Sequence, residues 1–347
     1  MKTHKKMFYF IKYVATSPTK LTNFFMIETS KKLKRVNAWG YPHTMMIEPA
    51  NYCNLQCPMC PTGKGQLGRE KQKLEFDNFK KLIDEMGKYV VHLRMFGWGE
   101  PLIHQDLFKM IRYAKDKKMF VNIHTNAFFL NQENVKKMVE SKMDELNISL
   151  DGASQETYSK YRRNGDFKKT CENIKLIDQY KKEKNTKYPI TNLQFIVMKH
   201  NEHEIDQVKK LAENLGVNRL VLKVVGVDTK EEAEQYLPSQ ESLRGYEIED
   251  DRLVSKVSNE GSACKMLWTE ATVWVDGSVV PCCYDYMNKY SFGNAFKDGF
   301  KTIWKGQKIR NFRKQFLEDK NKIPICKMCT KTNTGSETII RDTRIKK

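Results

Sequence analysis

Three cysteines lie close together on residues 48–61, which read Glu-Pro-Ala-Asn-Tyr-Cys-Asn-Leu-Gln-Cys-Pro-Met-Cys-Pro. Cys53, Cys57 and Cys60 have the spacing C-x3-C-x2-C. Three thiolates on one short loop can bind three irons of a four-iron cluster and leave the fourth iron without a protein ligand. Structural zinc sites use four ligands, and no second ligand pair follows before Cys171. The spacing therefore favours a 4Fe-4S cluster with one open iron, with zinc as the alternative.

The chain is long and apolar enough to bury a substantial core. Its 347 residues are 40% hydrophobic and 11% aromatic, which suits one large folded domain and a small one. The formal net charge is +19, from 61 Lys and Arg against 42 Asp and Glu. This excess favours an anionic substrate, nucleic acid or an anionic membrane surface as a partner. Basic residues dispersed over solvated helix faces would give the same net charge without any such partner.

The cysteines also indicate the compartment. The chain has nine cysteines. It has no run of 18 apolar residues, so no membrane-spanning helix is predicted, and no secretory signal is predicted at its N-terminal segment. Most of the cysteines form clusters instead of scattering as a disulfide framework. This pattern indicates a reducing environment, and we expect a cytoplasmic protein.

Residues 1–43 are predicted to form a basic amphipathic helical segment. Residues 1–35 contain nine Lys and Arg but only one acid, Glu28, mixed with aromatic residues. Such a helix suits the surface of an anionic membrane, or it can cover a neighbouring core as a lid. The sequence leaves both uses open.

Residues 44–225 alternate short apolar runs with longer segments of helical periodicity. The predicted strands are 45–47, 90–96, 120–124, 146–150, 193–197 and 219–224, and the predicted helices are 76–89, 107–114, 135–139, a segment around 158, 167–180 and 205–215. Six such units build a parallel sheet with right-handed crossovers, either open or curled towards a barrel. In both folds ligands gather beyond the carboxyl ends of the strands, where the cysteine loop follows the first strand.

Polar residues recur at the other strand ends. Glycines and Glu100 follow the second strand in Gly97-Trp-Gly-Glu-Pro101, and His124, Thr125 and Asn126 end the third. The fourth strand ends in Ser149-Leu-Asp-Gly, and Asn201 and Glu204 follow the fifth. Because these ends share one edge of the sheet, the sequence predicts a ligand site there.

Two of these segments resemble motifs of the radical S-adenosylmethionine (SAM) enzymes. The C-x3-C-x2-C loop resembles the signature of that superfamily, and residues 97–101 resemble its Gly-Gly-Glu-Pro motif, with Trp98-Gly99 in place of the glycine pair. The resemblance implies a partial (β/α)6 TIM barrel over residues 44–225. It also implies a 4Fe-4S cluster on the three cysteines, with SAM chelating the open iron.

The same resemblance implies the residues that contact SAM. They are Gly97, Gly99, Glu100 and Pro101 for the amino group, Ser149 and Asp151 for the carboxylate or ribose, Arg162 or Arg163 for the carboxylate, and Asn201 for the adenosine or ribose. Between the two arginines the sequence does not choose.

A small second domain is predicted at residues 264–330, after a mostly surface connection at 226–263 and before a basic tail at 331–347. Asp276-Gly277 between apolar runs predicts a β-hairpin, and residues 296–316 have helical periodicity. The hairpin brings two cysteines together, and C-x2-C spacing joins two more, so this set suits zinc or a fully ligated cluster. The four cysteines are Cys264, Cys282, Cys326 and Cys329.

This C-terminal pattern resembles the SPASM domain of radical SAM enzymes. Full SPASM domains carry further cysteines, and none follows Cys329, so the resemblance is to the shorter twitch type with one auxiliary 4Fe-4S cluster. Cys283 and Cys171 are expected to pack rather than bind metal. His124 and Asp285 are candidate bases for a proton transfer from the substrate.

The resemblance implies a radical SAM oxidoreductase. Such an enzyme reductively cleaves SAM to a 5′-deoxyadenosyl radical, which abstracts hydrogen from the substrate, with electrons from a donor such as flavodoxin or ferredoxin. One auxiliary cluster favours a small-molecule or sugar-like substrate, and a peptide- or protein-modifying SPASM enzyme is the alternative. A zinc-containing nucleic-acid-binding protein is the alternative from another class, but the six βα units argue against it, and nucleic acid is not expected as a partner.

Overall fold

The computed structural model describes residues 10–15, 17–250, 252–256, 263–327, 329 and 339–345. The chain forms two compact units. The first unit contains Met1–Tyr52, Leu67–Asn122 and Gly261–Lys327, and the second contains Cys53–Gln66, Ile123–Glu260 and Met328–Lys347. These units cut across the predicted domains, so the division at residues 225 and 264 stays a prediction.

The first described element of the first unit is the π-helix η1 (Phe10–Val14), and α-helices and short strands follow. Its elements up to residue 122 are α2 (Pro18–Lys32), β1 (Thr44–Ile47), α3 (Phe76–Met86), β2 (His92–Met95), η2 (Pro101–Ile103), α4 (Leu107–Asp116) and the first half of β3 (Phe120–Thr125). The later elements are α10 (Lys265–Trp268), β9 (Glu270–Val273), β10 (Ser278–Val280), β11 (Gly293–Asn294), α11 (Ala295–Asp298), α12 (Phe300–Trp304), α13 (Gln307–Asp319), η5 (Lys320–Lys322) and α14 (Pro324–Lys327).

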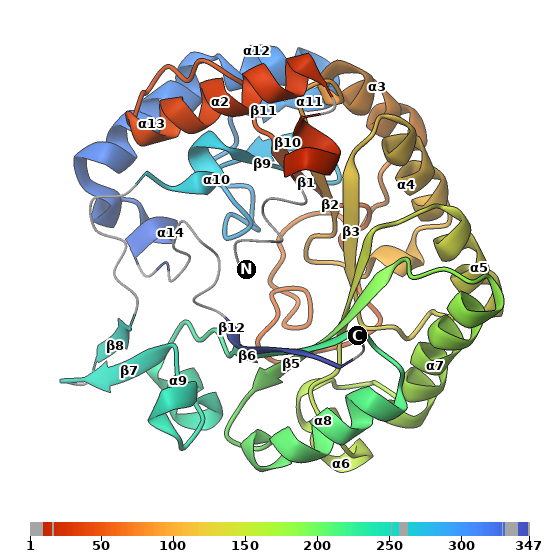
Figure 1. Ribbon diagram of the computed structural model, residues 1–347. Coiled ribbons are helices and arrows are strands. Elements are labelled where there is room, and N and C mark those ends of the chain that lie inside the picture. Colours follow the sequence, from red (N-terminus) through yellow and green to blue (C-terminus); the bar gives the residue numbers. More distant parts are fainter. Residues whose placement is uncertain are drawn as a thin grey trace. The chain divides into compact units, whose positions relative to one another are not determined.

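The strands of the first unit pair in the order β11-β10-β9-β1-β2-β3. β1 lies between β9 and β2 and is parallel to both, and all four of its residues are buried, as expected for a strand covered on both faces. The predicted hairpin is present, because β9 and β10 are antiparallel and Gly277 in their turn has a φ of 90°. Figure 1 shows α2, α12 and α13 together on the outer side of these strands.

The second unit contains the longest helix, α7 (Phe167–Glu183), which has 17 residues. Its elements are α5 (Gln132–Glu140), β4 (Glu145–Ser149), α6 (Gln155–Tyr161), α7 (Phe167–Glu183), β5 (Ile190–Val197), η3 (Glu202–Glu204), α8 (Ile205–Asn214), β6 (Arg219–Val224), α9 (Lys230–Tyr236), η4 (Glu241–Leu243), β7 (Tyr246–Glu249), β8 (Arg252–Ser255) and β12 (Ile339–Arg344).

The strands of the second unit pair in the order β4-β5-β6-β12, with β4, β5 and β6 parallel. Apolar residues of β4 and β5 such as Leu146, Ile148, Leu193 and Phe195 are fully buried. Figure 1 shows α7 and α8 running outside these strands. Parallel strands joined by helices, in both units, confirm the predicted mixed α/β fold with a parallel sheet.

Three predicted segments differ from the structure. Residues 226–263 are more than a connection, because they include α9 and the antiparallel β7-β8 pair, and Tyr236 and Tyr246 enter the core around the cysteine loop. The helical segment 296–316 is divided into α11, α12 and α13 at Gly299 and Gly306. Part of the predicted tail, Ile339–Arg344, is the strand β12, antiparallel to β6.

Candidate functional site

The cysteine loop packs on a single hydrophobic cluster of the second unit. The Cys57 side chain is part of this cluster, and Cys53 and Cys60 are half-buried against it. The loop turns tightly, because Cys60 N donates to Cys57 O over 3.1 Å. Gly63 lies so close that a Cβ there would be 2.3 Å from Cys57 O, so only glycine fits. All three thiols therefore lie at the edge of the same packed core.

Nitrogen donors point at two of the sulfurs. Arg162 Nη1 lies 3.6 Å from Cys57 Sγ, and Asn126 Nδ2 lies 3.6 Å from Cys53 Sγ. Leu55 N is a second donor to Cys53 Sγ, at 3.4 Å. Burial raises the pKa of the Cys57 thiol, and the Arg162 charge acts in the opposite direction. N–H groups aimed at sulfur stabilise thiolates and are one means by which a protein tunes an iron-sulfur cluster.

The donor chemistry of these residues fits an iron-sulfur cluster. Among the described residues, no three His, Cys, Asp or Glu side chains converge so as to hold one metal ion. A cubane needs a different arrangement, because it spreads three thiolates over three irons. Asn54 Nδ2, beside Cys53, is buried and has no hydrogen-bond partner in the part of the chain that the structure describes. A cluster sulfide or a bound ligand at the loop would provide the missing acceptor.

The structure distinguishes the two candidate arginines. Arg162 Nε and Nη2 lie 2.6 and 2.5 Å from Asp151 Oδ2, and Asp151 is fully buried. The Arg163 side chain is exposed, and its main-chain oxygen accepts from Gln56 N of the loop over 3.1 Å. Arg162 is therefore the arginine whose charge lies at the cysteine loop. Asp151 also accepts from Ile196 N, over 2.7 Å. Its bonds hold Arg162 and β5, and its direct contact with SAM stays a prediction.

Two other predicted residues are engaged within the protein. Asn201 is fully buried, donates to Asp151 O and Ile196 O, and accepts from Met198 N. These bonds use its amide group, and its contact with the adenosine or ribose of SAM stays a prediction. Glu204 accepts from Ala153 N and Thr157 Oγ1. Ser149 ends β4 opposite Gln194 and is half-buried, and its contact with SAM stays a prediction.

The turn at residues 97–101 is built against residues 48–52 of the first unit. A Cβ on Gly97 would lie 2.6 Å from the Glu48 carboxylate, and one on Gly99 would lie 2.2 Å from Ala50 O. Both glycines are therefore required by close approach. Glu100 N donates to Tyr52 O, and the Glu100 carboxylate caps η2 by accepting from Leu102 N, next to Pro101. The turn is thus fixed to the residue that precedes Cys53 in the chain, and its contacts with SAM stay a prediction.

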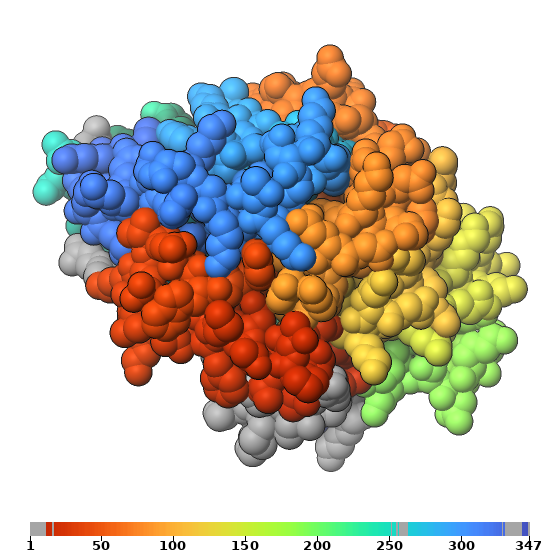
Figure 2. All heavy atoms as spheres, turned by 90° about the horizontal axis from the view of Figure 1, so that it is seen from above, coloured from red at the N-terminus to blue at the C-terminus, as the bar shows by residue number. Residues whose placement is uncertain are grey.

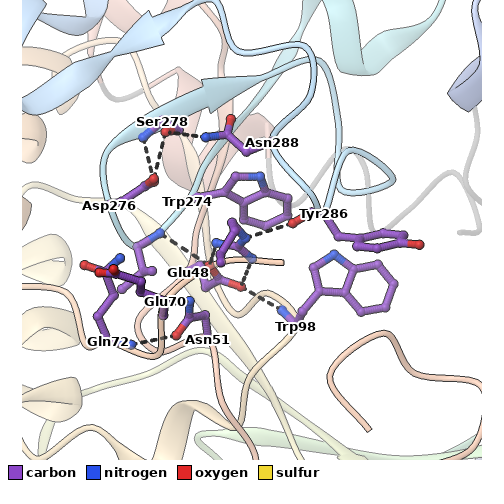
Figure 3. Close-up of polar contacts among 12 residues, drawn as sticks. Glu48, Asn51, Glu70, Gln72, Trp98, Trp274, Asp276, Ser278, Tyr286 and Asn288 are labelled. Carbon is purple, nitrogen blue, oxygen red and sulfur yellow. Dashed lines mark hydrogen bonds and ion pairs between the residues drawn. The ribbon is translucent and has the colours of Figure 1, made fainter. Parts of the chain in front are cut away.

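A buried carboxylate, Glu48, joins three segments of the first unit (Figure 3). Glu48 is fully buried and accepts from both terminal nitrogens of Arg69, at 2.6 and 3.1 Å. It also accepts from Trp98 N, at 3.0 Å, and from Val275 N, at 3.4 Å. The sequence alone predicts no role for Glu48 or Arg69. An acid directly after the apolar strand Met45–Ile47 is the signal that indicates such a buried pair.

Three side chains tie the segment after β10 to this carboxylate site. Trp98 Nε1 donates to Cys283 O over 2.8 Å, and Trp274 Nε1 donates to Asp285 O over 3.0 Å. Arg69 Nε donates to Tyr286 O over 2.8 Å. The Trp98 and Tyr286 rings meet edge to face, as Figure 3 shows. The loop that follows Cys282 is therefore fastened to the turn at residues 97–101.

The remaining candidates have local roles. Asp285 is buried and accepts from Lys289 N and Tyr290 N, so its carboxylate stabilises the loop, and burial raises its pKa. Its predicted role as a base is not supported by these bonds. Cys283 packs with Trp98 and Trp274, as predicted. Burial raises the pKa of Cys171 to about 11, which suits an unreactive thiol. His124 lies half-buried on β3.

The predicted auxiliary ligands lie in four places along the C-terminal segment. Cys264 precedes α10, Cys282 follows β10, Cys326 is in α14, and Cys329 follows it. All four side chains are half-buried. Four cysteines are the donor set of a fully ligated cluster, and the ligand assignment stays a prediction.

Comparison with known proteins identifies both regions. The model of the radical SAM superfamily matches residues 47–226, just over half of the chain, and that of an iron-sulfur cluster-binding domain, SPASM, matches residues 264–330. A protein of Pyrococcus furiosus named "tungsten-containing aldehyde ferredoxin oxidoreductase cofactor-modifying protein" is 25% identical over 319 residues, which are 82% of this chain and 86% of that protein.

Two further relatives are named for peptides. The PqqA peptide cyclase of Bradyrhizobium diazoefficiens is 24% identical over 192 residues, which are 55% of this chain but only 48% of the cyclase. The crystal structure of Streptococcus suis SuiB bound to precursor peptide SuiA has a TM-score of 0.61 at 15% identity, covering 87% of this chain and 74% of that one. This last similarity concerns the fold.

The superfamily implies a 4Fe-4S cluster and SAM, and the SPASM domain implies auxiliary iron-sulfur binding. The chain belongs to the radical SAM superfamily and is a radical SAM enzyme with a C-terminal SPASM iron-sulfur domain.

Proposed function

We propose that this enzyme modifies a peptide. SAM bound at the cluster supplies hydrogen-atom abstraction, and the protein supplies the binding and orientation of the substrate. The sequence favours a small molecule or sugar-like substrate because of the single predicted auxiliary cluster. The relatives favour the peptide alternative at least as well, and the count of auxiliary clusters does not by itself choose a substrate.

The observation that carries the proposal is the similarity to a peptide cyclase. The fold supports it, since it is shared with an enzyme crystallised with its precursor peptide. The peptide cyclase and the crystallised enzyme are both distant from this protein in sequence. The proposal therefore concerns the class of substrate and not the bond that is modified.

Neutral hydrogen-bonding groups lie on β4 and β5 and suit a peptide or a hydroxyl-bearing substrate. Asn147 pairs with Asn192 across the two strands, and Asn147 Oδ1 accepts from Asn192 Nδ2 over 3.0 Å and from Gln194 Nε2 over 3.1 Å. Asn192 Oδ1 is buried and has no hydrogen-bond partner among the described residues. An unpaired buried acceptor is costly, and a main-chain N–H of a bound peptide would satisfy it.

A cofactor or another small molecule is the second candidate substrate. It rests on the Pyrococcus furiosus relative, which is named for modifying a cofactor and matches most of both chains. Carboxamides such as Asn147 and Gln194 also bind hydroxyl groups, so the two candidates differ in the size of the substrate more than in its hydrogen bonds.

Deuterium transfer distinguishes the two candidates. An extract of the source cells grown in deuterated medium is separated into a peptide pool and a small-molecule pool, and the latter is freed of its own deuterated SAM and 5′-deoxyadenosine. Each is incubated without oxygen with the enzyme, unlabelled SAM and a reductant, and deuterium in the released 5′-deoxyadenosine is measured by mass spectrometry. We expect deuterium with the peptide pool, and we expect its loss when that pool is first digested with a protease.

The matched control is the C53A/C57A/C60A variant, which keeps the SPASM domain and should release no 5′-deoxyadenosine. Deuterium from the small-molecule pool alone, or a peptide-pool signal that survives protease, would contradict a peptide substrate. It would favour the second candidate.

A further inference from the structure

Helix α2 has polar residues on its buried side. Lys20, Asn23 and Ser30 are each at most 4% exposed. Their hydrogen bonds are made within the first unit: Lys20 Nζ donates to Lys117 O and Lys118 O, and Asn23 donates to Tyr41 O and accepts from Tyr41 N. A surface helix usually buries its apolar stripe and exposes its polar one. α2 departs from that rule in part: Lys20, Asn23 and Ser30 share its fully buried positions with Ile27, while Leu21 and Phe24 are half-buried against a cluster that contains Tyr13 and Phe120.

Apolar side chains lie instead on the exposed side of this segment. Phe25 is 56% exposed, Met26 40%, Leu33 56% and Trp39 42%. These four make up the majority of the seven large hydrophobic side chains that are exposed in the described part of the chain. We call them the α2 patch. Such a concentration on one short stretch marks a binding surface, whereas scattered exposed apolar residues would not.

The members of the α2 patch near Ser30 are held together by hydrogen bonds. Ser30 Oγ donates to Met26 O over 2.7 Å and accepts from Trp39 N over 2.9 Å. The Arg35 guanidinium lies over the Trp39 ring, 4.4 Å from its centre. Figure 2 shows this red part of the chain on the surface of the molecule, beside blue residues that follow residue 290.

Basic residues surround the α2 patch. Lys31 and Lys32 precede Leu33, and Lys34 and Arg35 follow it, while Glu28 is the sole acid between residues 17 and 40. Glu28 is neutralised, because it pairs with Lys31 over 2.6 Å and with His43 over 2.9 Å. Lys32, Lys34 and Arg35 are exposed.

We propose that the α2 patch docks the enzyme onto the surface of an anionic membrane. Exposed Phe, Leu and Trp side chains flanked by Lys and Arg are the combination that inserts into the boundary between headgroups and acyl chains. A neighbouring cluster of basic residues is attracted by anionic lipids. A protein partner is the less favourable occupant, because lysines are depleted from protein interfaces and here they flank the patch.

Vesicle sedimentation with the complete enzyme tests the proposal. The enzyme is mixed with vesicles of phosphatidylcholine alone or of equal parts phosphatidylcholine and phosphatidylglycerol, and the bound fraction is measured. We expect binding to the anionic vesicles that weakens as salt is raised, since salt screens surface charge. F25S/L33S should weaken this binding at least about tenfold by removing the inserted apolar area. K32E/K34E should weaken binding to the anionic vesicles more strongly than tenfold. Loss of each lysine charge alone costs about fivefold, and the two effects multiply.

The matched control is I248S/V254S, which removes the exposed apolar pair of β7 and β8 and should leave vesicle binding unchanged. Iron content and circular dichroism of each variant establish that it is folded. Three results would overturn the proposal: no vesicle binding by the unmodified enzyme, equal binding to both kinds of vesicle, or undiminished binding by both patch variants. Self-association that F25S/L33S abolishes, without vesicle binding, would assign the α2 patch to a second copy of the chain.

Discussion

The guanidinium of Arg162 is held between an acid and a thiol. Asp151 binds one side of the guanidinium through two bonds, and Arg162 Nη1 donates to Cys57 Sγ on the other side. The positive charge therefore lies next to a predicted iron ligand, where it favours the thiolate and the more reduced cluster. Arg162 acts on the cluster through Cys57, which makes it a positioning residue in addition to its predicted contact with SAM.

Replacing Arg162 by Gln is expected to lower the reduction potential of the SAM-binding cluster. It should also decrease SAM cleavage about 10- to 100-fold, as is typical when a residue behind a metal ligand is lost. A redox titration followed by electron paramagnetic resonance measures the potential. R163Q is the matched control, because the Arg163 side chain is exposed. An unchanged potential in R162Q would show that Arg162 contributes only to folding or to SAM binding.

Trp98 stands at a position where the related motif has glycine, and its indole reaches the loop after Cys282. W98F keeps an aromatic ring, smaller than the indole, and leaves Cys283 O without its donor. We expect the free energy of unfolding to fall by about 1 kcal/mol, the usual net value of one hydrogen bond. We also expect a changed paramagnetic resonance spectrum of the auxiliary cluster with little change in that of the SAM-binding cluster. Urea unfolding and the two spectra test this, and a spectral change confined to the SAM-binding cluster would contradict it.

At the scale of elements, the sequence predicted the six parallel strands because each has a continuous or alternating apolar run. The arrangement of the later strands could not be predicted in this way. β9 pairs with β1 and β12 pairs with β6, although both partners lie far apart in the sequence. Local periodicity carries no information about such pairings. The Glu48 site was missed for the same reason, since Arg69, Trp98 and Val275 come from three separate segments.

An ion pair links two strands on either side of β1. Arg94 of β2 lies 2.8 Å from Glu270 of β9, and Lys265 lies 3.3 Å from it. Burial alone would raise the pKa of Glu270, but Arg94 and Lys265 lower it to about 2. The folded-state pKa is therefore below the ordinary value of 4.5. The pair stabilises the protein fully above pH 4.5, and this contribution is lost as the pH falls towards 2.

E270Q is expected to lower the free energy of unfolding at pH 7 by about 2 kcal/mol. This is less than for a fully buried pair, because the Arg94 side chain is 26% exposed. Urea unfolding of both proteins should show the difference shrinking between pH 4.5 and pH 3. E133Q, at an exposed helical pair, is the control and should change little. A difference that does not depend on pH would contradict the ion-pair explanation.

At the scale of the whole molecule, two cysteine sets predict two clusters. Anaerobically purified enzyme should contain about eight irons per chain, as two four-iron clusters require. C53A/C57A/C60A should retain about four irons and lose reductive cleavage of SAM. C264A/C282A should also lose about half of the iron but keep the SAM-binding cluster. Iron analysis and cleavage assays measure both, and cleavage by the first variant would contradict the assignment of its cysteines.

The pairing of β1 with β9 has a consequence for how the protein is made. Thr44 lies opposite Glu270, so the partners are 226 positions apart in the sequence. Closing so long a loop is entropically costly, and contacts between distant residues slow folding. A ribosome must therefore deliver β9 before β1 gains its second neighbour and Glu48 its bond to Val275. Fragments that end at Val225 would expose an unpaired strand edge, so the radical SAM region expressed alone should aggregate.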